Sequence, residues 1–193
     1  MPKVSTSEIR NGLTIKLNDS DLYTIQEFQH VKPGKGGAFI RTKLKGVIHG
    51  KTIDKTFRSG EKLESVRVER HPYQFLYQEG NLCHFMHLET YEQRPLEVSR
   101  VKKSEFMKDG ETVTLVIDAD NEEVLYAEPP DHVDQAITQT EPGLRGDTAQ
   151  GGSKPATIES GASIQVPLFI NEGDMVRVDT RTGEYIERVK QND

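Results

Sequence analysis

The chain has 193 residues and 34% hydrophobic content, enough for one ordinary domain or for two or three small ones with thin cores. No stretch approaches eighteen apolar residues, and the first residues lack the apolar segment of a signal peptide, so we expect a cytoplasmic protein without a membrane partner. Charged residues make up 29% without any block of five or six like charges, which argues against wholesale disorder.

Charge is distributed unevenly along the chain. Residues 1–65 carry 12 Lys+Arg against 7 Asp+Glu, whereas residues 66–193 carry 13 against 24. Between Phe28 and Ile53 there are six cations and no carboxylate: Lys32, Lys35, Arg41, Lys43, Lys45 and Lys51. A basic head on an acidic body indicates that one end meets a polyanion, although a solvated strand face would give the same run of charges.

Hydrophobic residues recur with period two in the first 65 residues, which predicts strands rather than helices. The expected strands are 13–17, 22–31, 38–48 and 51–57. They surround one glycine-rich hairpin at residues 32–37. We therefore predict a small barrel of about 65 residues at the N-terminus.

The same period continues through the rest of the chain. Strands are expected at 73–77, 82–87, 112–117 and 124–127, and then at 136–140, 163–168, 175–179 and 185–189. Residues 98–108 can form one short helix or a loop, and Pro129-Pro130 marks a boundary or an edge. Short strands with turns every eight to twelve residues suit small closed barrels such as the OB-fold.

Lys35 occupies the centre of Pro33-Gly34-Lys35-Gly36-Gly37, a hairpin tip with three glycines around one long cation. Glycine removes side-chain bulk and permits positive φ, so this tip can approach another surface closely and present its lysine. A phosphate-binding P-loop does not fit, because the Ser/Thr and the helix after the lysine are missing. A flexible hairpin with an incidental lysine is the alternative.

Other candidate sites are weaker. The run from Cys83 to His87 alternates like a strand, so at most two of its possible ligands converge, whereas structural zinc needs four. No nucleophile elbow, zinc-protease motif or activated cysteine is present, so we expect no catalytic site, metal or cofactor. The glycine-rich loop 142–155 can grip phosphate through its backbone amides and Thr148, although a plain flexible linker has the same composition.

Several motifs together resemble the bacterial elongation factor P family across essentially the whole chain. They are the tip Val31 to Gly36, Phe85-Met86 followed by Glu89 to Gln93, the tripeptide Gly146-Asp147-Thr148, and a closing stretch from Val178 to Tyr185. A C-terminal family signature is met at Lys154, Ala156, Gly161, Ile164, Val166, Pro167, Ile170 and Gly173.

The resemblance implies a fold and a partner. It implies an all-β protein of three small barrels in an L-shaped, tRNA-like arrangement: an SH3-like (KOW-type) domain at 1–65, and OB-folds at 66–129 and 130–193. It also implies a monomeric, non-catalytic factor that binds the ribosome between the peptidyl and exit sites. Such a factor positions the CCA end of peptidyl-tRNA, stimulates peptide bond formation and relieves stalling at consecutive prolines.

The resemblance also implies roles for particular residues. Lys35 is extended by a lysine-modifying enzyme and reaches the CCA end, supported by the rest of the tip: Lys32, Pro33, Gly34, Gly36 and Gly37. Lys32 and Arg41 contact backbone phosphates. Gly146, Asp147 and Thr148 lie near exit-site messenger RNA, while Tyr185 and Arg188 face the peptidyl-tRNA anticodon stem.

Related families fit less well. Elongation-factor-P-like paralogues usually lack the tip lysine and the Gly-Asp-Thr loop, and the hypusine-bearing initiation factors stop after two domains. From a different class of function, an OB-fold RNA-binding module without a role in peptide bond formation remains an alternative. Such a module would need exposed aromatic side chains for base stacking, and aromatics are only 7% of this chain.

Overall fold

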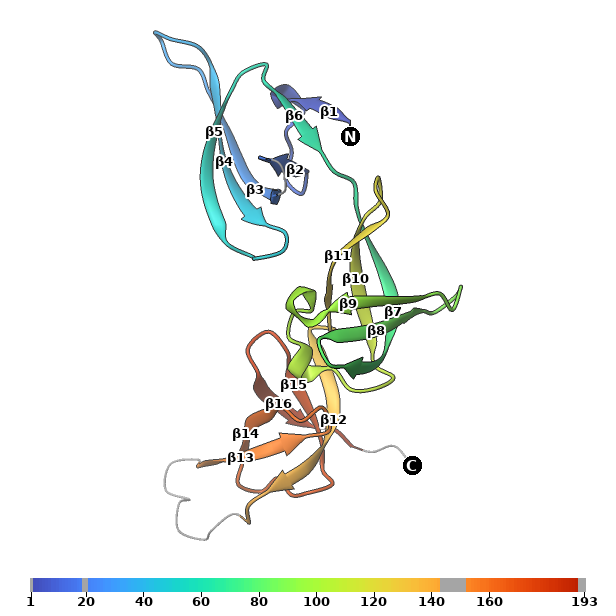
Figure 1. Cartoon of the computed structure of the whole chain (residues 1–193). Coiled ribbons are helices and arrows are strands. Elements are labelled where there is room, and N and C mark those ends of the chain that lie inside the picture. Colours follow the sequence, from blue (N-terminus) through green and yellow to red (C-terminus); the bar gives the residue numbers. More distant parts are fainter. Residues whose placement is uncertain (1, 19–20, 143–151, 191–193) are drawn as a thin grey trace. The chain divides into compact units, whose positions relative to one another are not determined.

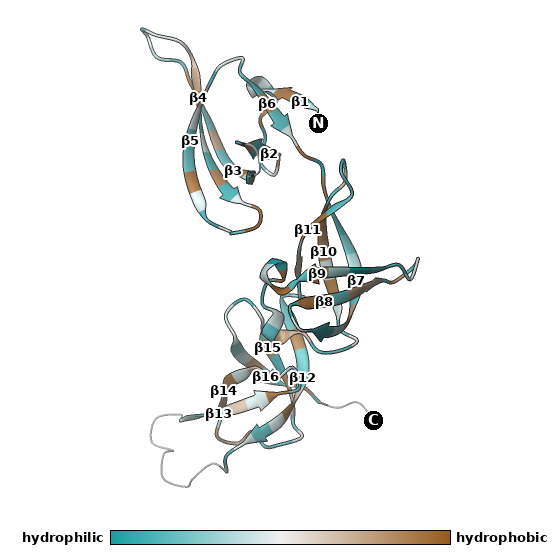
Figure 2. Ribbon diagram, viewed as in Figure 1, coloured by the Kyte–Doolittle hydropathy of each residue, from teal (hydrophilic) through white to brown (hydrophobic). Residues whose placement is uncertain are grey.

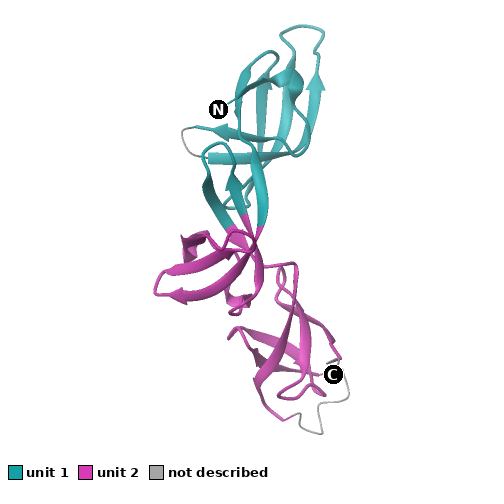
Figure 3. Ribbon diagram, turned by 90° about the vertical axis from the view of Figure 1, so that its right-hand side faces the viewer, with its two compact units in different colours: residues 1–71, 116–126 teal, residues 72–115, 127–193 magenta. Residues whose placement is uncertain are grey.

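The computed structural model of the chain describes residues 2–18, 21–142 and 152–190 (Figure 1). Its regular elements are β-strands and three-residue 3-10 helices, and the strands form three sheets. The prediction of an all-β protein with three sheet domains is therefore confirmed. The chain divides into two compact units, residues 1–71 with 116–126 and residues 72–115 with 127–193 (Figure 3).

The first sheet has six strands in the order β1-β6-β2-β3-β4-β5. Their bounds are β1 Lys3–Ser5, β2 Thr14–Leu17, β3 Asp21–Val31, β4 Phe39–Gly46, β5 Thr52–Arg58 and β6 Lys62–Ser65, with the 3-10 helix η1 at Thr6–Glu8. The prediction contained four of these strands and missed β1 and β6. Each contains a single apolar residue, Val4 in β1 and Leu63 in β6, so no alternation of apolar side chains marks it.

Alternation along β4 shows how the sequence produces this sheet. Ile40, Thr42 and Leu44 are buried, whereas Arg41, Lys43 and Lys45 on the opposite face are exposed. Hydrophilic and hydrophobic bands alternate along β4 and β5 in Figure 2. The inner face packs into a core of Ile9, Ile15, Leu17, Tyr23, Ile25, Ile40, Leu44, Phe57 and Leu63.

A second cluster in the same unit joins the first sheet to the turn end of two later strands, β10 (Thr112–Asp118) and β11 (Glu123–Glu128). Leu22 and Val47 pack there with Val66, Val116, Leu125 and Tyr126. The backbone contributes as well, because the amide of Ala119 donates to the carbonyl oxygen of Arg67 at 2.8 Å. Residues 116–126 thus share a hydrophobic core with the first sheet.

The second sheet has the order β11-β10-β7-β8-β9. Its strands are β7 Val68–Glu79, β8 Leu82–His87, β9 Gln93–Glu97, β10 Thr112–Asp118 and β11 Glu123–Glu128. β9 was not predicted, since Pro95 interrupts its pattern. The single helix or loop expected at 98–108 is instead two 3-10 helices, η2 Val98–Arg100 and η3 Ser104–Phe106.

The third sheet has the order β14-β13-β12-β15-β16. Its strands are β12 His132–Thr140, β13 Ser153–Ile158, β14 Ser163–Pro167, β15 Met175–Asp179 and β16 Glu184–Arg188. The predicted loop 142–155 is wrong at its end, because β13 begins at Ser153. The inward positions of β13 are Lys154, Ala156 and Ile158, and a lysine at the first of them conceals the alternation.

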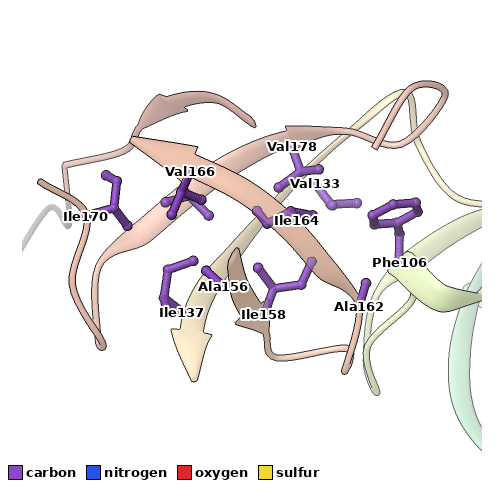
Figure 4. Packing of buried hydrophobic residues seen from close by; sticks show 11 residues of the cluster. Phe106, Val133, Ile137, Ala156, Ile158, Ala162, Ile164, Val166, Ile170 and Val178 are labelled. Atoms are coloured by element: carbon purple, nitrogen blue, oxygen red, sulfur yellow. The ribbon is translucent and has the colours of Figure 1, made fainter. Parts of the chain in front are cut away.

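The core of the third sheet accepts one side chain from η3. Phe106 lies among residues of β12 to β15, including Val133, Ile164 and Val178 (Figure 4). Its carbonyl oxygen accepts a 2.6 Å hydrogen bond from Nε2 of the fully buried Gln135. The segment that the sequence left ambiguous is therefore an anchor within the second unit.

Candidate functional site

The candidate site is the loop that joins β3 to β4. The two strands pair up to Val31 and Phe39, and the carbonyl oxygen of Ala38 accepts a 3.0 Å hydrogen bond from the amide of Ser59. Beyond this closed base, all six residues from Lys32 to Gly37 are exposed. Figure 1 shows the loop extending past the ends of the strands. We refer to residues 32–37 as the lysine tip.

The glycines set the shape of the lysine tip. Gly36 has a φ of +108°, a conformation that residues with a Cβ atom rarely adopt. A Cβ atom at Gly34 or Gly37 would meet no other atom within 4 Å, so no neighbouring side chain crowds the loop. The tip is narrow, and its long side chains belong to Lys32 and Lys35.

The charges of the tip are not neutralised by neighbours. Among the described residues, neither Lys32 nor Lys35 forms an ion pair or a hydrogen bond through its side chain. Exposed and without a partner, an ammonium group remains available to an external anion. This arrangement can hold a phosphate or a carboxylate, but it includes no nucleophile or general base.

The exposed face of β3, β4 and β5 continues the basic character below the tip. Lys43 is compensated, because its Nζ lies 3.6 Å from Oε2 of Glu27 and Asp54 is its register partner on β5. Arg41 faces the uncharged Gln29 and Thr56 in the register, and its guanidinium lies 5.6 Å from the Phe39 ring centroid. All of these residues except Phe39 line a groove of about 420 Å³.

The structure places Arg41 on the exposed face of β4, and Phe39, the ring that orients it, was not predicted from the sequence. Cation–π contact with an aromatic ring restricts the guanidinium at modest cost. The i, i+2 spacing on one strand was the available signal, since both side chains then lie on one face.

Two candidate residues of the third sheet occupy β16. Tyr185 is half-buried and packs against the core of that sheet, and it lines a groove of about 970 Å³ together with Pro167 and Phe169. Arg188 is exposed, with Nη1 at 3.8 Å from Oδ1 of Asp174. Gly146, Asp147 and Thr148 lie outside the described residues.

Lys154, the first residue of the C-terminal signature, has a structural role. Its side chain is only 6% exposed, and Nζ donates a 2.7 Å hydrogen bond to the carbonyl oxygen of Glu141. The ammonium group therefore ties the start of β13 to Glu141, the residue that follows β12. A lysine in a family motif can thus have a purely structural role as a buried hydrogen-bond donor, whereas Lys35 is exposed.

The run Cys83 to His87 lies in β8, Leu82–His87, with Cys83 and Phe85 fully buried. Burial raises the pKa of the Cys83 thiol, which keeps it in its unreactive form. Within the described part of the chain, no three His, Cys, Asp or Glu side chains are placed to share a metal ion. Its helices are also too short to cross a membrane.

These observations define a class of protein. It has several small β-barrel domains, and its distinctive functional feature is an exposed lysine at the end of a narrow hairpin loop. Family models match three consecutive segments: the elongation factor P KOW-like domain at residues 5–63, the elongation factor P OB domain at 68–126, and the elongation factor P C-terminal domain at 133–188. Together these segments cover nearly the whole chain.

Curated relatives agree with this assignment. Elongation factor P of Salinibacter ruber is 54% identical over 184 residues, covering 95% of each chain. Elongation factor P 1 of Porphyromonas gingivalis is 51% identical over 187 residues, covering 97% of this chain and 99% of the relative. The chain belongs to the elongation factor P family, and it is a non-catalytic factor of translation elongation.

A solved structure supports the fold. A translation initiation factor eIF-5A family protein from Naegleria fowleri superposes with a TM-score of 0.51 at 16% identity. The superposition covers 66% of this chain and 94% of that protein. At this identity the likeness concerns the fold alone.

Proposed function

We propose that the chain binds the ribosome between the peptidyl and exit sites and places Lys35 against the CCA end of peptidyl-tRNA. The observation that carries this proposal is the lysine tip itself: a narrow, exposed loop whose apical cation has no partner among the described residues. Membership of the elongation factor P family supplies the translational context.

The tip acts by positioning rather than by reaction. A cation held beside the backbone of the CCA end restrains the end and the attached nascent chain, which lowers the entropic part of the barrier. Each 1.4 kcal/mol or so removed from the barrier is about a tenfold gain in rate. The gain is largest where the reacting amine is poorly placed, as at consecutive prolines, and the ribosome supplies the chemistry.

Lys32 and Arg41 act as phosphate contacts in this proposal. Arg41 suits the role better than Lys43, because its register partners Gln29 and Thr56 carry no charge, whereas Lys43 is paired with Glu27. Each such contact contributes to affinity and makes it dependent on salt. Pro33, Gly34, Gly36 and Gly37 act as the narrow support for Lys35.

In the third sheet, we assign Tyr185 and Arg188 to the anticodon stem of peptidyl-tRNA, and Gly146, Asp147 and Thr148 to exit-site messenger RNA. The fixed position of the Tyr185 ring against the core favours a stacking role. The chain acts as a monomer. An enzyme that extends Lys35 completes the set of partners, since the exposed Nζ is open to modification.

The decisive experiment compares Lys35→Ala with Lys51→Ala. Lys51 is an exposed lysine in the turn that joins β4 to β5, at the opposite end of β4 from the lysine tip. We expect Lys35→Ala to keep the melting temperature and ribosome co-sedimentation but to lose rescue of a consecutive-proline reporter, whereas Lys51→Ala retains rescue. Full rescue by Lys35→Ala would remove the proposed mechanism.

A second measurement separates this function from a general RNA-binding module. The proposed factor co-sediments with ribosomes and binds a free oligonucleotide weakly, whereas an RNA-binding module does the reverse. Intact-mass spectrometry of protein from the native host tests the modification of Lys35. A mass that equals the unmodified chain would contradict that part of the proposal.

A further inference from the structure

The turn between β8 and β9, residues 88–92, exposes an aromatic ring on a strained backbone. Tyr91 is 70% exposed, and its φ of +60° lies in the left-handed region. A bulky residue with positive φ is uncommon, because its Cβ atom crowds the following carbonyl oxygen. Such strain persists only where the surrounding structure enforces it, and it concentrates at functional positions.

His87 enforces the conformation of this turn. Its Nδ1 atom accepts hydrogen bonds from the amides of Glu89 at 3.1 Å and Thr90 at 3.2 Å, while its carbonyl oxygen accepts from the amide of Tyr91 at 3.0 Å. The amide of His87 donates to the carbonyl oxygen of Glu92 at 2.9 Å. These bonds close the turn on itself.

The imidazole ring of His87 is in turn held in place by a buried aromatic ring. It meets the buried ring of Tyr73 in a T-shaped arrangement, with centroids 4.9 Å apart. The turn therefore rests on the core of the second sheet. Tyr91 is presented by a rigid support, not by a loose loop.

The surroundings of Tyr91 are apolar and acidic. Leu88 in the same turn is 39% exposed, and Glu89 and Glu92 are both exposed. Nη2 of Arg94 lies 3.2 Å from Oε1 of Glu92 and orients that carboxylate, whereas Glu89 has no ion pair among the described residues. Residues 66–129 carry 13 Asp+Glu against 7 Lys+Arg.

This combination selects a partner by its charge. A phosphate backbone would meet the carboxylate of Glu89, which has no ion pair among the described residues, and be repelled, which argues against RNA at this turn. A guanidinium or ammonium group can lie over the face of Tyr91 and pair with a flanking carboxylate at the same time. Aromatic rings beside charges of one sign are also typical anchors of protein interfaces.

We propose that the turn 88–92 is a docking site for a basic protein segment, with Tyr91 receiving an arginine or lysine side chain that pairs with Glu89. The site is independent of the lysine tip, since it uses no residue of the first sheet. The chain would then bind RNA through the basic lysine tip and a basic protein segment through the acidic turn 88–92.

The chain contains a matched control for this proposal. The turn between β10 and β11 is also acidic, with Asp120, Glu122 and Glu123 exposed, and Glu122 also has positive φ, at +55°. It exposes no aromatic side chain between Ala119 and Glu123. A ligand that merely follows negative charge would perturb both turns equally.

The test is an NMR titration of the isotope-labelled full chain with a blocked peptide of alternating arginine and glycine. We expect saturable shifts at residues 87–93 that exceed those at 119–123. Tyr91→Ala is expected to weaken binding about fivefold, and Glu89→Gln about threefold. Oligouridylate, as the RNA probe, is expected to leave residues 87–93 unchanged.

Melting temperature provides the second measurement. Tyr91→Gly and Tyr91→Asn relieve the backbone strain, so both are expected to melt at or above the wild-type temperature while losing the peptide. Equal shifts at both turns, a response to oligouridylate instead of the peptide, or unchanged affinity in Tyr91→Ala would each overturn the proposal. A large drop in melting temperature for both variants would assign Tyr91 a structural role and would also overturn it.

Discussion

The lysine tip and the turn 88–92 solve the same problem in opposite ways. Each presents one side chain at the end of a β-hairpin, Lys35 in the first case and Tyr91 in the second. At the lysine tip, glycine occupies the positive-φ position, and the presented side chain is a neighbour of that glycine. At the turn 88–92, the presented residue itself occupies the positive-φ position.

The comparison shows two ways to build a hairpin end: a narrow loop with glycine at the positive-φ position, or a bulky residue at that position on a hydrogen-bonded support. Glycines remove bulk, so a loop can enter a narrow space, but they also leave it with few contacts of its own. The turn 88–92 keeps a bulky strained residue and needs a hydrogen-bonded support, which His87 provides. The narrow lysine tip is suited to an anion in a confined space, whereas the rigid turn 88–92 with its exposed aromatic ring is suited to a partner at the protein surface.

The largest effects are expected in the cores that carry the two hairpins. Phe57 lies in the core of the first sheet and Phe85 in the second sheet, and both are almost completely buried. Phe57→Ala and Phe85→Ala should each lower the free energy of unfolding by about 3–5 kcal/mol, because each leaves a cavity. Denaturant unfolding measures this, and a loss below about 1 kcal/mol would show that the core can collapse around the change.

Replacing the two contrasted lysines is the next test. Lys154→Met should cost about 1–3 kcal/mol, since it leaves the carbonyl oxygen of Glu141 without its hydrogen bond. Lys35→Met should change stability by no more than about 0.5 kcal/mol, because Lys35 is exposed and without a described partner. Thermal unfolding of both variants checks the pair. Equal losses would mean that Lys35 also has a structural role.

Changing the positive-φ residues should give effects of opposite sign. Gly36→Ala is expected to cost about 1–2 kcal/mol, since alanine at a φ of +108° is strained. Tyr91→Gly should gain up to about 1 kcal/mol, less the entropy of the more flexible unfolded chain. Local hydrogen exchange at each hairpin reports the change, and effects of the same sign at both would contradict the comparison.

The smallest expected effect is the pH dependence of stability in the third sheet. Acidic side chains there have ion-pair or hydrogen-bond partners, whereas Glu89 has no ion pair among the described residues. Nε and Nη2 of Arg177 donate to Asp134 at 2.8 and 2.9 Å, which lowers the pKa of Asp134. The backbone amide of Ala136 and the ammonium of Lys108 lower the pKa of Glu159. Burial raises the pKa of Glu111.

A lowered pKa in the folded state stabilises the fold above the ordinary carboxyl pKa of about 4 and loses that contribution as pH falls through the folded value. The third sheet should therefore lose stability below about pH 4, and Asp134→Asn should flatten this loss and lower the neutral melting temperature by a few degrees. Glu111 acts in the opposite direction, so Glu111→Gln should slightly raise stability at neutral pH. Melting curves between pH 3 and 7 measure both signs.

Much of the fold was readable from period-two patterns with clear turns. The strands near 22–31, 38–48 and 112–117 were predicted because apolar residues alternate there and glycine or asparagine bounds them. β1, β6, β9 and β13 were missed because they hold a single apolar residue, contain proline or bury a lysine. In such strands the burial pattern comes from neighbours rather than from composition.

The candidate site divides in the same way. Lys35 could be named as a candidate from sequence, since three glycines around one lysine predict a slender hairpin tip that presents the lysine. Tyr91 could not, because tyrosine has no preference for positive φ and its exposure depends on the bonds to His87. Local sequence therefore marks a loop, while long-range contacts decide which side chain the loop presents.

The sequence by itself determined the all-β class, the glycine-flanked lysine and the family, since each depends on residue types at short spacing. Tertiary structure alone decided that Arg41 has uncharged register partners whereas Lys43 is paired with Glu27, that Lys154 is buried, and that Phe106 belongs to the core of the third sheet. The physical reason is that charge pairing and burial depend on which strands become neighbours, and chain order does not specify this.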